Sequence, residues 1–350
     1  MRIGARGSPL SLAQTGSVAR ELEAASPGLA VQIVPIRTRG DDPGRAPLGA
    51  AGIKGLFVKE IEDALLLGAI DLAVHSAKDL PSALPEGLAL GAAPRRASPF
   101  DALIAEGAAG VGSLKKGARV GTSSLRRRAQ LLALRPDLAI VPLRGNLDTR
   151  LGKVVSGELD ATLLGASGLR RLKGEAFPVS EIPPGEILPA PGQGQLALEL
   201  REGDEDTLRL CAPLNHALSE AALACERAFM AALGAGCQTP AAAWARIEGG
   251  AFVASSLVCE LDGSRTLKAE GRLEGFRAIP ETGAVSPPSS VAFSEPAPAA
   301  AGGPGGAGGS RGSGEAAPDL EAARGLGRSL AERLLEAGAA EIIARAERGI

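Results

Sequence analysis

The stretch AVHSAKDLP (73–81) places four polar side chains directly after an apolar run: His75, Ser76, Lys78 and Asp79. Open α/β sheets collect their reactive groups at the carboxyl ends of strands, where these side chains would stand. The ammonium group of Lys78 favours the ionised form of the neighbouring Asp79 carboxyl group. An ionised carboxylate there can stabilise a developing cation or accept a proton from an N–H group. The alternative is an ion pair on the surface of a turn.

A second motif, VGTSSLRRRAQ (120–130), leads from a strand into a helix. Ser124 stands at the start of that helix, where free backbone N–H groups and the helix dipole attract anions. Arginines 126–128 follow in the first turns, so one or two of them should face the same point. A solvated basic face is the alternative. The P-loop spacing is absent.

Other predicted strand ends also carry arginine. They supply Arg6 with Ser8 in IGARGSPL, Arg144 and Arg150 in LRGNLDTR, and Arg170 and Arg171 in GLRRLK. The planar guanidinium group matches carboxylate and phosphate geometry. Because several independent strand ends carry these groups, we expect a cleft that binds a ligand with many carboxylates.

Cys237 lies in GAGCQTP (234–240), a loop rich in glycine. A thiol in such a setting is a candidate nucleophile or a point of covalent attachment. We expect the other three cysteines, at 211, 225 and 259, to be buried. With no C-x-x-C pair and only two histidines, the sequence predicts no metal site.

The composition limits the partners. A net charge of −2 gives no bulk attraction to nucleic acid or acidic membranes, and 2% aromatic residues leave few rings on which bases could stack. The N-terminus lacks the apolar stretch of a signal peptide, and no window resembles a membrane span. These features predict a cytoplasmic protein with no nucleic-acid or membrane partner.

Strands and helices alternate over the first two hundred residues. We expect strands at 1–5, 31–36, 71–76, 118–123, 138–145 and 160–166, and helices at 8–25, 56–68, 124–135 and 146–157. Ser8 is the expected cap of the first helix, with Pro9 in its first turn. The alternation predicts parallel sheets covered by helices, arranged as two α/β domains with a cleft between them.

The pattern changes after residue 200. We expect a long helix at 215–236, an antiparallel sheet from 241–248, 251–263 and 265–275, and a final helix at 320–343. Residues 280–318 are rich in Pro, Gly, Ser and Ala and predict a disordered insertion. The expected domains are 1–95 with 195–212, then 96–194, and finally 215–350. The glycine-rich loop at 38–60 is either a lid or simply a mobile loop.

Taken together, these segments resemble the porphobilinogen deaminase family. The likeness covers nearly the whole chain except 280–318. It is carried by ARGSPLSLAQ, TRGD, KGLFVKE, DLAVHSAKDLP, GTSSLRRRAQL, LRGNLDTRL, LPAPGQGQLALE, NHALS and AALACERAFMAALGAGCQTP. The resemblance implies two doubly wound α/β domains like those of type II periplasmic binding proteins, with a smaller α+β C-terminal domain. It also implies a monomer.

The resemblance further implies a transferase that joins four porphobilinogen units head to tail into hydroxymethylbilane, releasing ammonia each time. Cys237 would hold a dipyrromethane cofactor through a thioether, and Asp79 would be the catalytic carboxylate that steadies the azafulvene intermediate. The implied cofactor-binding residues are Lys78, Ser124, Arg126, Arg127, Arg144 and Arg150. The implied substrate-binding residues are Arg6, Ser8, Gln14, Phe57, Arg144, Arg171 and Gln193.

The sequence departs from the family pattern at Ala50, where family members commonly carry lysine, so that Lys54 stands alone in its loop. The residues alone leave two other classes open. One is a non-catalytic anion-binding protein built from two receptor-like domains, and the other is a thiol hydrolase that uses Cys237.

Overall fold

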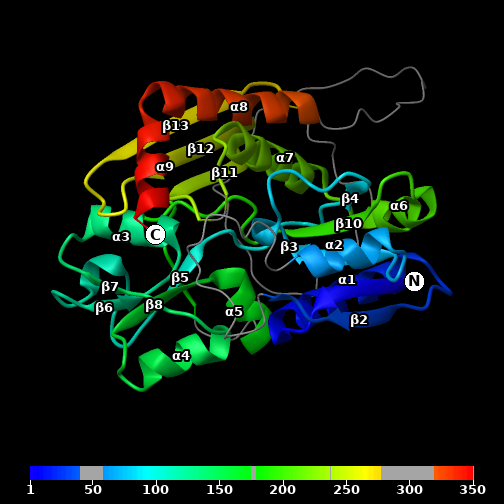
Figure 1. Ribbon diagram of the computed structural model, residues 1–350, viewed down its shortest axis with the longest axis horizontal. Coiled ribbons are helices and arrows are strands. Elements are labelled where there is room, and N and C mark those ends of the chain that lie inside the picture. The colour runs from blue at the N-terminus through cyan, green and yellow to red at the C-terminus, as the bar shows by residue number, and fades with distance from the viewer. Residues whose placement is uncertain (40–57, 175–178, 237, 277–318, 350) are drawn as a thin grey trace, which may run out of the picture.

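The computed structural model describes residues 1–39, 58–174, 179–236, 238–276 and 319–349. Within these ranges the chain forms two five-stranded sheets flanked by helices and a three-stranded sheet (Figure 1). This mixed α/β architecture with a smaller C-terminal sheet confirms the predicted fold class. The predicted lid loop and the low-complexity insertion lie almost entirely outside the described residues, and so do Ala50, Lys54, Phe57 and Cys237.

The first sheet has the strand order β2-β1-β3-β10-β4. Its strands are β1 (Arg2–Arg6), β2 (Gln32–Ile36), β3 (Leu72–Ser76), β4 (Leu88–Ala92) and β10 (Leu196–Arg201). Strands β2, β1 and β3 are parallel, but β10 runs antiparallel to both β3 and β4. The expectation of parallel strands is therefore wrong for β10. The physical reason is that β10 comes back from the second sheet and enters the first from the opposite end.

The second sheet has the order β7-β6-β8-β5-β9. It contains β5 (Asp101–Ala105), β6 (Arg119–Gly121), β7 (Ala139–Val141), β8 (Ala161–Gly165) and β9 (Ser180–Glu181). Strands β7, β6 and β8 are parallel, whereas β5 is antiparallel to its neighbours β8 and β9. Because β4 is antiparallel to β10, and β9 is antiparallel to β5, each sheet has four strands in one direction and a single reversed strand, β10 in the first sheet and β5 in the second.

Helices cover both sheets. They are α1 (Pro9–Ala25), α2 (Lys59–Leu66), α3 (Leu125–Leu134), α4 (Leu147–Val155), α5 (Ala166–Lys173) and α6 (Glu205–Cys211), with short 3-10 turns at Ala77–Asp79, Val111–Ser113 and Ala212–Leu214. As predicted, Ser8 caps α1 through a hydrogen bond from the Ser11 amide, with Pro9 in the first turn. Apolar side chains of α1, such as Val18 and Leu22, pack on Leu72 and Leu198 of the first sheet. This packing fixes the helix N-terminus beside the carboxyl end of β1.

The C-terminal sheet is an antiparallel meander of β11 (Ala241–Glu248), β12 (Ala251–Cys259) and β13 (Thr266–Leu273). Helices α7 (Ala217–Ala232) and α8 (Leu320–Glu336) lie beside it, and α9 (Ala339–Arg348) follows (Figure 1). The single helix expected at 320–343 is therefore two helices. Gly338 has φ +100°, a left-handed conformation that favours glycine and breaks the helix there.

Two connections between the first and second sheets, near residues 96 and 193, lie side by side. The Ala97 amide donates to the Gly194 carbonyl at 3.1 Å. The buried carboxylate of Glu226 on α7 accepts from the Gly192 amide at 2.6 Å and from Arg96 Nη1 at 2.6 Å. The C-terminal part of the chain therefore fixes the junction from which the site residues extend.

The cysteines at 211, 225 and 259 are all buried, as predicted. No described helix is both long enough and apolar enough to cross a bilayer.

Candidate functional site

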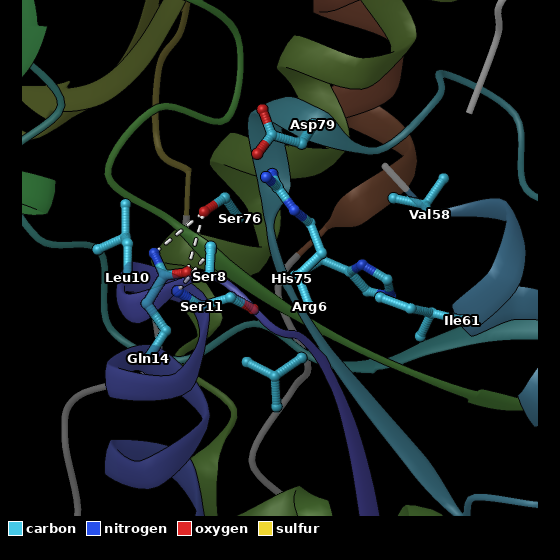
Figure 2. A pocket seen from close by; sticks show the side chains of 11 residues that line it. Arg6, Ser8, Leu10, Ser11, Gln14, Val58, Ile61, His75, Ser76 and Asp79 are labelled. Carbon is cyan, nitrogen blue, oxygen red and sulfur yellow. Dashed lines mark hydrogen bonds between the residues drawn. The ribbon is translucent and has the colours of Figure 1, made fainter. Parts of the chain in front are cut away.

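A small pocket of about 60 Å³ opens at the carboxyl ends of β1 and β3 (Figure 2). It contains four of the side chains that the family resemblance assigned to substrate binding or catalysis: Arg6, Ser8, Gln14 and Asp79. In Figure 2 the guanidinium group of Arg6 and the carboxylate of Asp79 point to the same side of the pocket. Other lining residues are Leu10, Ser11, Val58, Ile61, Val74, His75 and Ser76.

Asp79 lies on the 3-10 turn that follows β3, where its side chain is exposed to solvent. The Ala77 amide at the start of that turn donates to the Gln195 carbonyl at 3.0 Å. Gly192, with φ +72°, packs so closely that a Cβ there would lie 3.0 Å from the backbone N of Lys78. The backbone of the junction therefore supports the turn that carries Lys78 and Asp79.

Helix α1 supplies the polar wall of the pocket. Gln14 is 5% exposed, and its side-chain amide hydrogen-bonds to Ser76 Oγ at 3.0 Å (Figure 2). This contact joins the first helix to the end of β3. It holds Ser8 and Arg6, which come just before the helix, at the pocket.

On the second sheet, Ser124 caps α3 and accepts from the Arg127 amide. Arg126 and Arg127, 5% and 6% exposed, both bind the fully buried Asp101 at the start of β5. The closest atoms are 2.8 Å apart for Arg126 Nη2 and 2.7 Å for Arg127 Nη2. Although burial would raise it, the pKa of Asp101 is held well below its ordinary value by the two guanidinium groups. A solvated basic face is therefore the wrong interpretation for these two arginines.

Gln193 lies in the same buried cluster. It is 1% exposed, and its side-chain amide donates to Asp101 Oδ1 at 2.9 Å and to the Pro99 carbonyl at 2.7 Å. Its Oε1 is buried and has no hydrogen-bond partner among the described residues. That oxygen lies close to Gly165, where an added Cβ would be 3.8 Å from it.

Lys78 connects the two sheets. Its Nζ would lie 3.6 Å from a Cβ added to Gly165, at the carboxyl end of β8. Burial lowers the pKa of Lys78, and its ammonium group also interacts electrostatically with Asp79 and with the charged cluster around Asp101. The first and second halves of the predicted site thus meet at this ammonium group.

Arg150, on α4, belongs to the same region. Its pKa is lowered by burial and by the nearby charge of Arg127, and its Nε donates to the Gly145 carbonyl at 2.9 Å. Arg144 is exposed in the segment after β7, and Arg171 is half-buried on α5.

The described residues here bring four cationic side chains to two carboxylates. The cations are Lys78, Arg126, Arg127 and Arg150, and the carboxylates are Asp79 and Asp101. The region therefore carries an excess of positive charge. Such an excess suits a ligand with several carboxylate groups, and it agrees with the chemistry expected of a dipyrromethane bearing acid side chains.

Sequence reasoning missed Asp101, which organises the arginines. The available signal was a carboxylate at the first position of the apolar run DALI, where an unpaired charge would be costly. Among the residues that the structure describes, no group of three or more His, Cys, Asp or Glu side chains is arranged to hold a metal ion.

Comparison with protein families gives two matches. Residues 1–209 match the model described as porphobilinogen deaminase, dipyromethane cofactor binding domain. Residues 221–291 match porphobilinogen deaminase, C-terminal domain.

Curated relatives agree with the family models. A porphobilinogen deaminase of Roseiflexus castenholzii is 50% identical over 263 residues, which cover 75% of this chain and 87% of that protein. One of Syntrophobacter fumaroxidans is 45% identical over 269 residues, covering 77% and 87%.

Solved structures are far less similar. A periplasmic VFT2 domain of BvgS from Bordetella pertussis aligns with a TM-score of 0.37 and 15% identity, covering 60% of this chain and 84% of that chain. The relatives are close and match most of this chain, and the first family model spans more than half of it. The chain therefore belongs to the porphobilinogen deaminase family.

Proposed function

We propose that this chain is a hydroxymethylbilane synthase: a transferase of porphyrin biosynthesis that joins four porphobilinogen molecules head to tail and releases one ammonia for each. Membership of the porphobilinogen deaminase family supports the reaction. The observation that carries the proposal to individual residues is the excess of cationic side chains around Lys78 and Arg127, next to a pocket that contains Asp79.

The proposed cofactor is a dipyrromethane attached to Cys237 through a thioether, a bond that a reducing cytoplasm does not cleave. When bound, it supplies the pyrrole carbon to which the first substrate ring is joined. Its side chains are carboxylates, and the donors proposed for them are Lys78, Ser124, Arg126, Arg127, Arg144 and Arg150. We also propose that the protein is cytoplasmic and monomeric, with domains at 1–95 plus 195–212, 96–194 and 215–350.

Asp79 is the proposed catalytic residue. When ammonia leaves porphobilinogen, positive charge develops on the pyrrole ring, and an anionic carboxylate beside it lowers the energy of that state. Arg6, on the same side of the pocket, would hold a substrate carboxylate, so that the ring nitrogen is directed toward Asp79. Ser8, Gln14, Phe57, Arg144, Arg171 and Gln193 are the other proposed substrate-binding residues.

Exposure of Asp79 to solvent also has a chemical consequence. Each condensation removes a proton from the pyrrole carbon that is joined, and that proton must reach water or the departing ammonia. A carboxylate at the mouth of the pocket can accept that proton from the pyrrole carbon and return it to solvent.

The attachment is tested by intact-protein mass. The wild-type protein should exceed its sequence mass by one dipyrromethane unit, and Cys237→Ser should not. Active wild-type protein with the bare sequence mass would refute the attachment.

The reaction is tested by measuring ammonia release from porphobilinogen. Asp79→Asn should lower kcat by about 10²–10³-fold, a range typical of removing one electrostatic contact to a transition state, while circular dichroism remains unchanged. Wild-type turnover by that variant would contradict the role of Asp79. Absence of ammonia release by the wild type would leave a carboxylate-binding protein as the better description.

A further inference from the structure

A second pocket, of about 370 Å³, lies where the first sheet meets the C-terminal helices. The pocket at Asp79 measures about 60 Å³, whereas pockets that bind small molecules in proteins typically measure about 300–1,000 Å³. The two pockets have no described lining residue in common. The second pocket is therefore large enough for a small-molecule ligand, and it is separate from the proposed catalytic site.

Most of the wall of the second pocket is apolar. Strand β4 contributes Leu90 and Ala92, and α8 contributes Leu320 in its first turn. Helix α7 lines the pocket with Glu220, Leu223, Ala224, Arg227, Ala228 and Ala231. Apolar surface of this extent favours the hydrocarbon body of a ligand, because burying it removes both surfaces from water.

Arg227 brings a cation to this apolar wall. Its Nη2 donates to the Ser82 carbonyl at 3.0 Å, and its Nη1 is buried with no hydrogen-bond partner among the described residues. Since the acceptor of Nη2 is a neutral carbonyl, no described carboxylate contacts this guanidinium group. Burial lowers the pKa of Arg227, although the charge of Glu199 acts in the opposite direction. Buried polar atoms in native proteins are nearly always paired, so Nη1 calls for an acceptor.

The other two ionisable side chains of the second pocket have polar partners. Glu220 Oε2 accepts a hydrogen bond from Asn215 Nδ2 at 2.7 Å. Glu220 precedes Arg227 by two turns of α7, which is about 10 Å along the helix axis. Arg324 is 46% exposed and pairs with Glu321, with 3.6 Å between the closest atoms. A single negative charge at Arg227 would therefore complete the pocket, whereas a dianion would also be repelled by Glu220.

We propose that the second pocket binds a small amphipathic monocarboxylate, whose carboxylate pairs with Arg227 and whose apolar body lies against α7 and β4. The carboxylate accepts a charge-assisted hydrogen bond from the guanidinium group and so gives the buried nitrogen its acceptor. The apolar body covers the leucine and alanine side chains of the wall. Because such a ligand contacts both the first sheet and the C-terminal helices, it binds the folded chain and not the unfolded one.

The site is tested with octanoate, which has one carboxylate and an apolar chain, by isothermal titration calorimetry on the holoenzyme. The test variant is Arg227→Met, in which an unbranched apolar side chain replaces the cation. The matched control is Arg209→Met on α6, which removes an arginine that is 74% exposed and pairs with Asp206. Circular dichroism checks that both variants are folded.

We expect wild type to bind one octanoate per chain and Arg227→Met to bind it about 10–100-fold more weakly, the range typical of losing one hydrogen bond to a charged group. Arg209→Met should retain the wild-type affinity. Absence of octanoate binding by the wild type would overturn the proposal. Equal affinities in wild type and Arg227→Met would also overturn it, since the carboxylate would then be bound elsewhere.

The class of ligand is tested with two further probes. Octanol has the same apolar chain without the charge, so it should bind more weakly than octanoate and with equal affinity to wild type and Arg227→Met. Inorganic phosphate lacks the apolar body and should not displace octanoate. Displacement by phosphate at a similar concentration would overturn an amphipathic ligand in favour of a simple anion.

A second variant serves if Arg227→Met fails to fold. Ala224→Leu keeps Arg227 but fills part of the pocket, so octanoate binding should be lost although the cation is present. Unchanged binding by Ala224→Leu would overturn the proposal. The titrations do not depend on ammonia release, so their outcome is independent of the proposed function.

Discussion

Replacing Asp101 by asparagine tests how the arginine cluster is held. Asp101 is fully buried, and its carboxylate accepts hydrogen bonds from Arg126, Arg127 and Gln193. Asparagine keeps the shape of the aspartate side chain, but its NH₂ group would face a guanidinium donor. The substitution also leaves the buried cations Arg126 and Arg127 without their counter-charge. Removing one partner of a buried ion pair costs about 3–5 kcal/mol, so we expect a loss in the free energy of unfolding in that range.

The single tryptophan gives a convenient assay. Trp244 packs edge-on against Phe100, with ring centroids 5.3 Å apart, directly beside Asp101. Urea unfolding followed by its fluorescence therefore reports on this region. The matched control is Asp137→Asn, which removes a similar carboxylate from Arg135 at the surface of the same half, where Asp137 Oδ1 lies 2.7 Å from Arg135 Nε. We expect that variant to lose much less stability.

The pH dependence adds a second criterion. The pKa of Asp101 is lower in the folded protein than in the unfolded chain. The ionised carboxylate therefore contributes fully to the free energy of unfolding above the unfolded-state pKa, and this contribution is lost only as the pH falls toward the folded-state pKa. The difference between wild type and Asp101→Asn should therefore be constant between about pH 5 and 8. If Asp101→Asn loses no more free energy of unfolding than the surface control Asp137→Asn, the view that Asp101 neutralises the buried arginines is refuted.

Three further outcomes are expected. Gly327→Ala should lower the thermal midpoint, because the new Cβ would lie 2.1 Å from the Cys225 carbonyl oxygen where α8 packs on α7; an unchanged midpoint would contradict that packing. Burial raises the pKa of Cys211 to about 12 and also raises the pKa values of Cys225 and Cys259. All three thiols should therefore resist a thiol reagent until the protein is unfolded, and the time course of thiol modification would show this. The pKa of Glu62 is raised to about 7 in the folded state, so the folded protein binds a proton at this carboxyl group more tightly than the unfolded chain does. The stability of the wild type should therefore fall relative to that of Glu62→Gln as the pH rises from about 5 to 8. A difference in thermal midpoint that does not depend on pH would contradict this.

Local features were predicted well from the sequence because local physics decides them. Ser8 followed by Pro9 marks a helix start, and Ser124 is a second helix cap. The alternation of apolar runs with amphipathic segments gave the α/β class. The single helix expected at 320–343 was wrong, although Gly338 in LEAGAAEII was a visible signal for a break.

Pairings between distant segments were not predictable in this way. The antiparallel course of β10 depends on where the chain returns from the second sheet, which no local pattern encodes. His75 and Glu199 are 124 residues apart in sequence, and their contact exists only because β10 pairs with β3. The roles of Asp79, Cys237 and the arginines as ligand contacts remain predictions, since they concern groups that only a bound ligand would bring into contact.

The pairing with Asp101 changes how the arginine-rich motif should be understood. A run of three arginines at a helix start reads as a set of ligand donors, yet two of them are already bound to a buried carboxylate of the chain. That carboxylate offsets part of their charge and fixes the guanidinium planes before any ligand arrives. Donors held in place need little reorganisation when an anion binds, so such a site combines a net positive charge with fixed geometry. In the proposed cofactor site, the cations that remain in excess, among them Lys78 and Arg150, would then determine how many ligand carboxylates this region can balance.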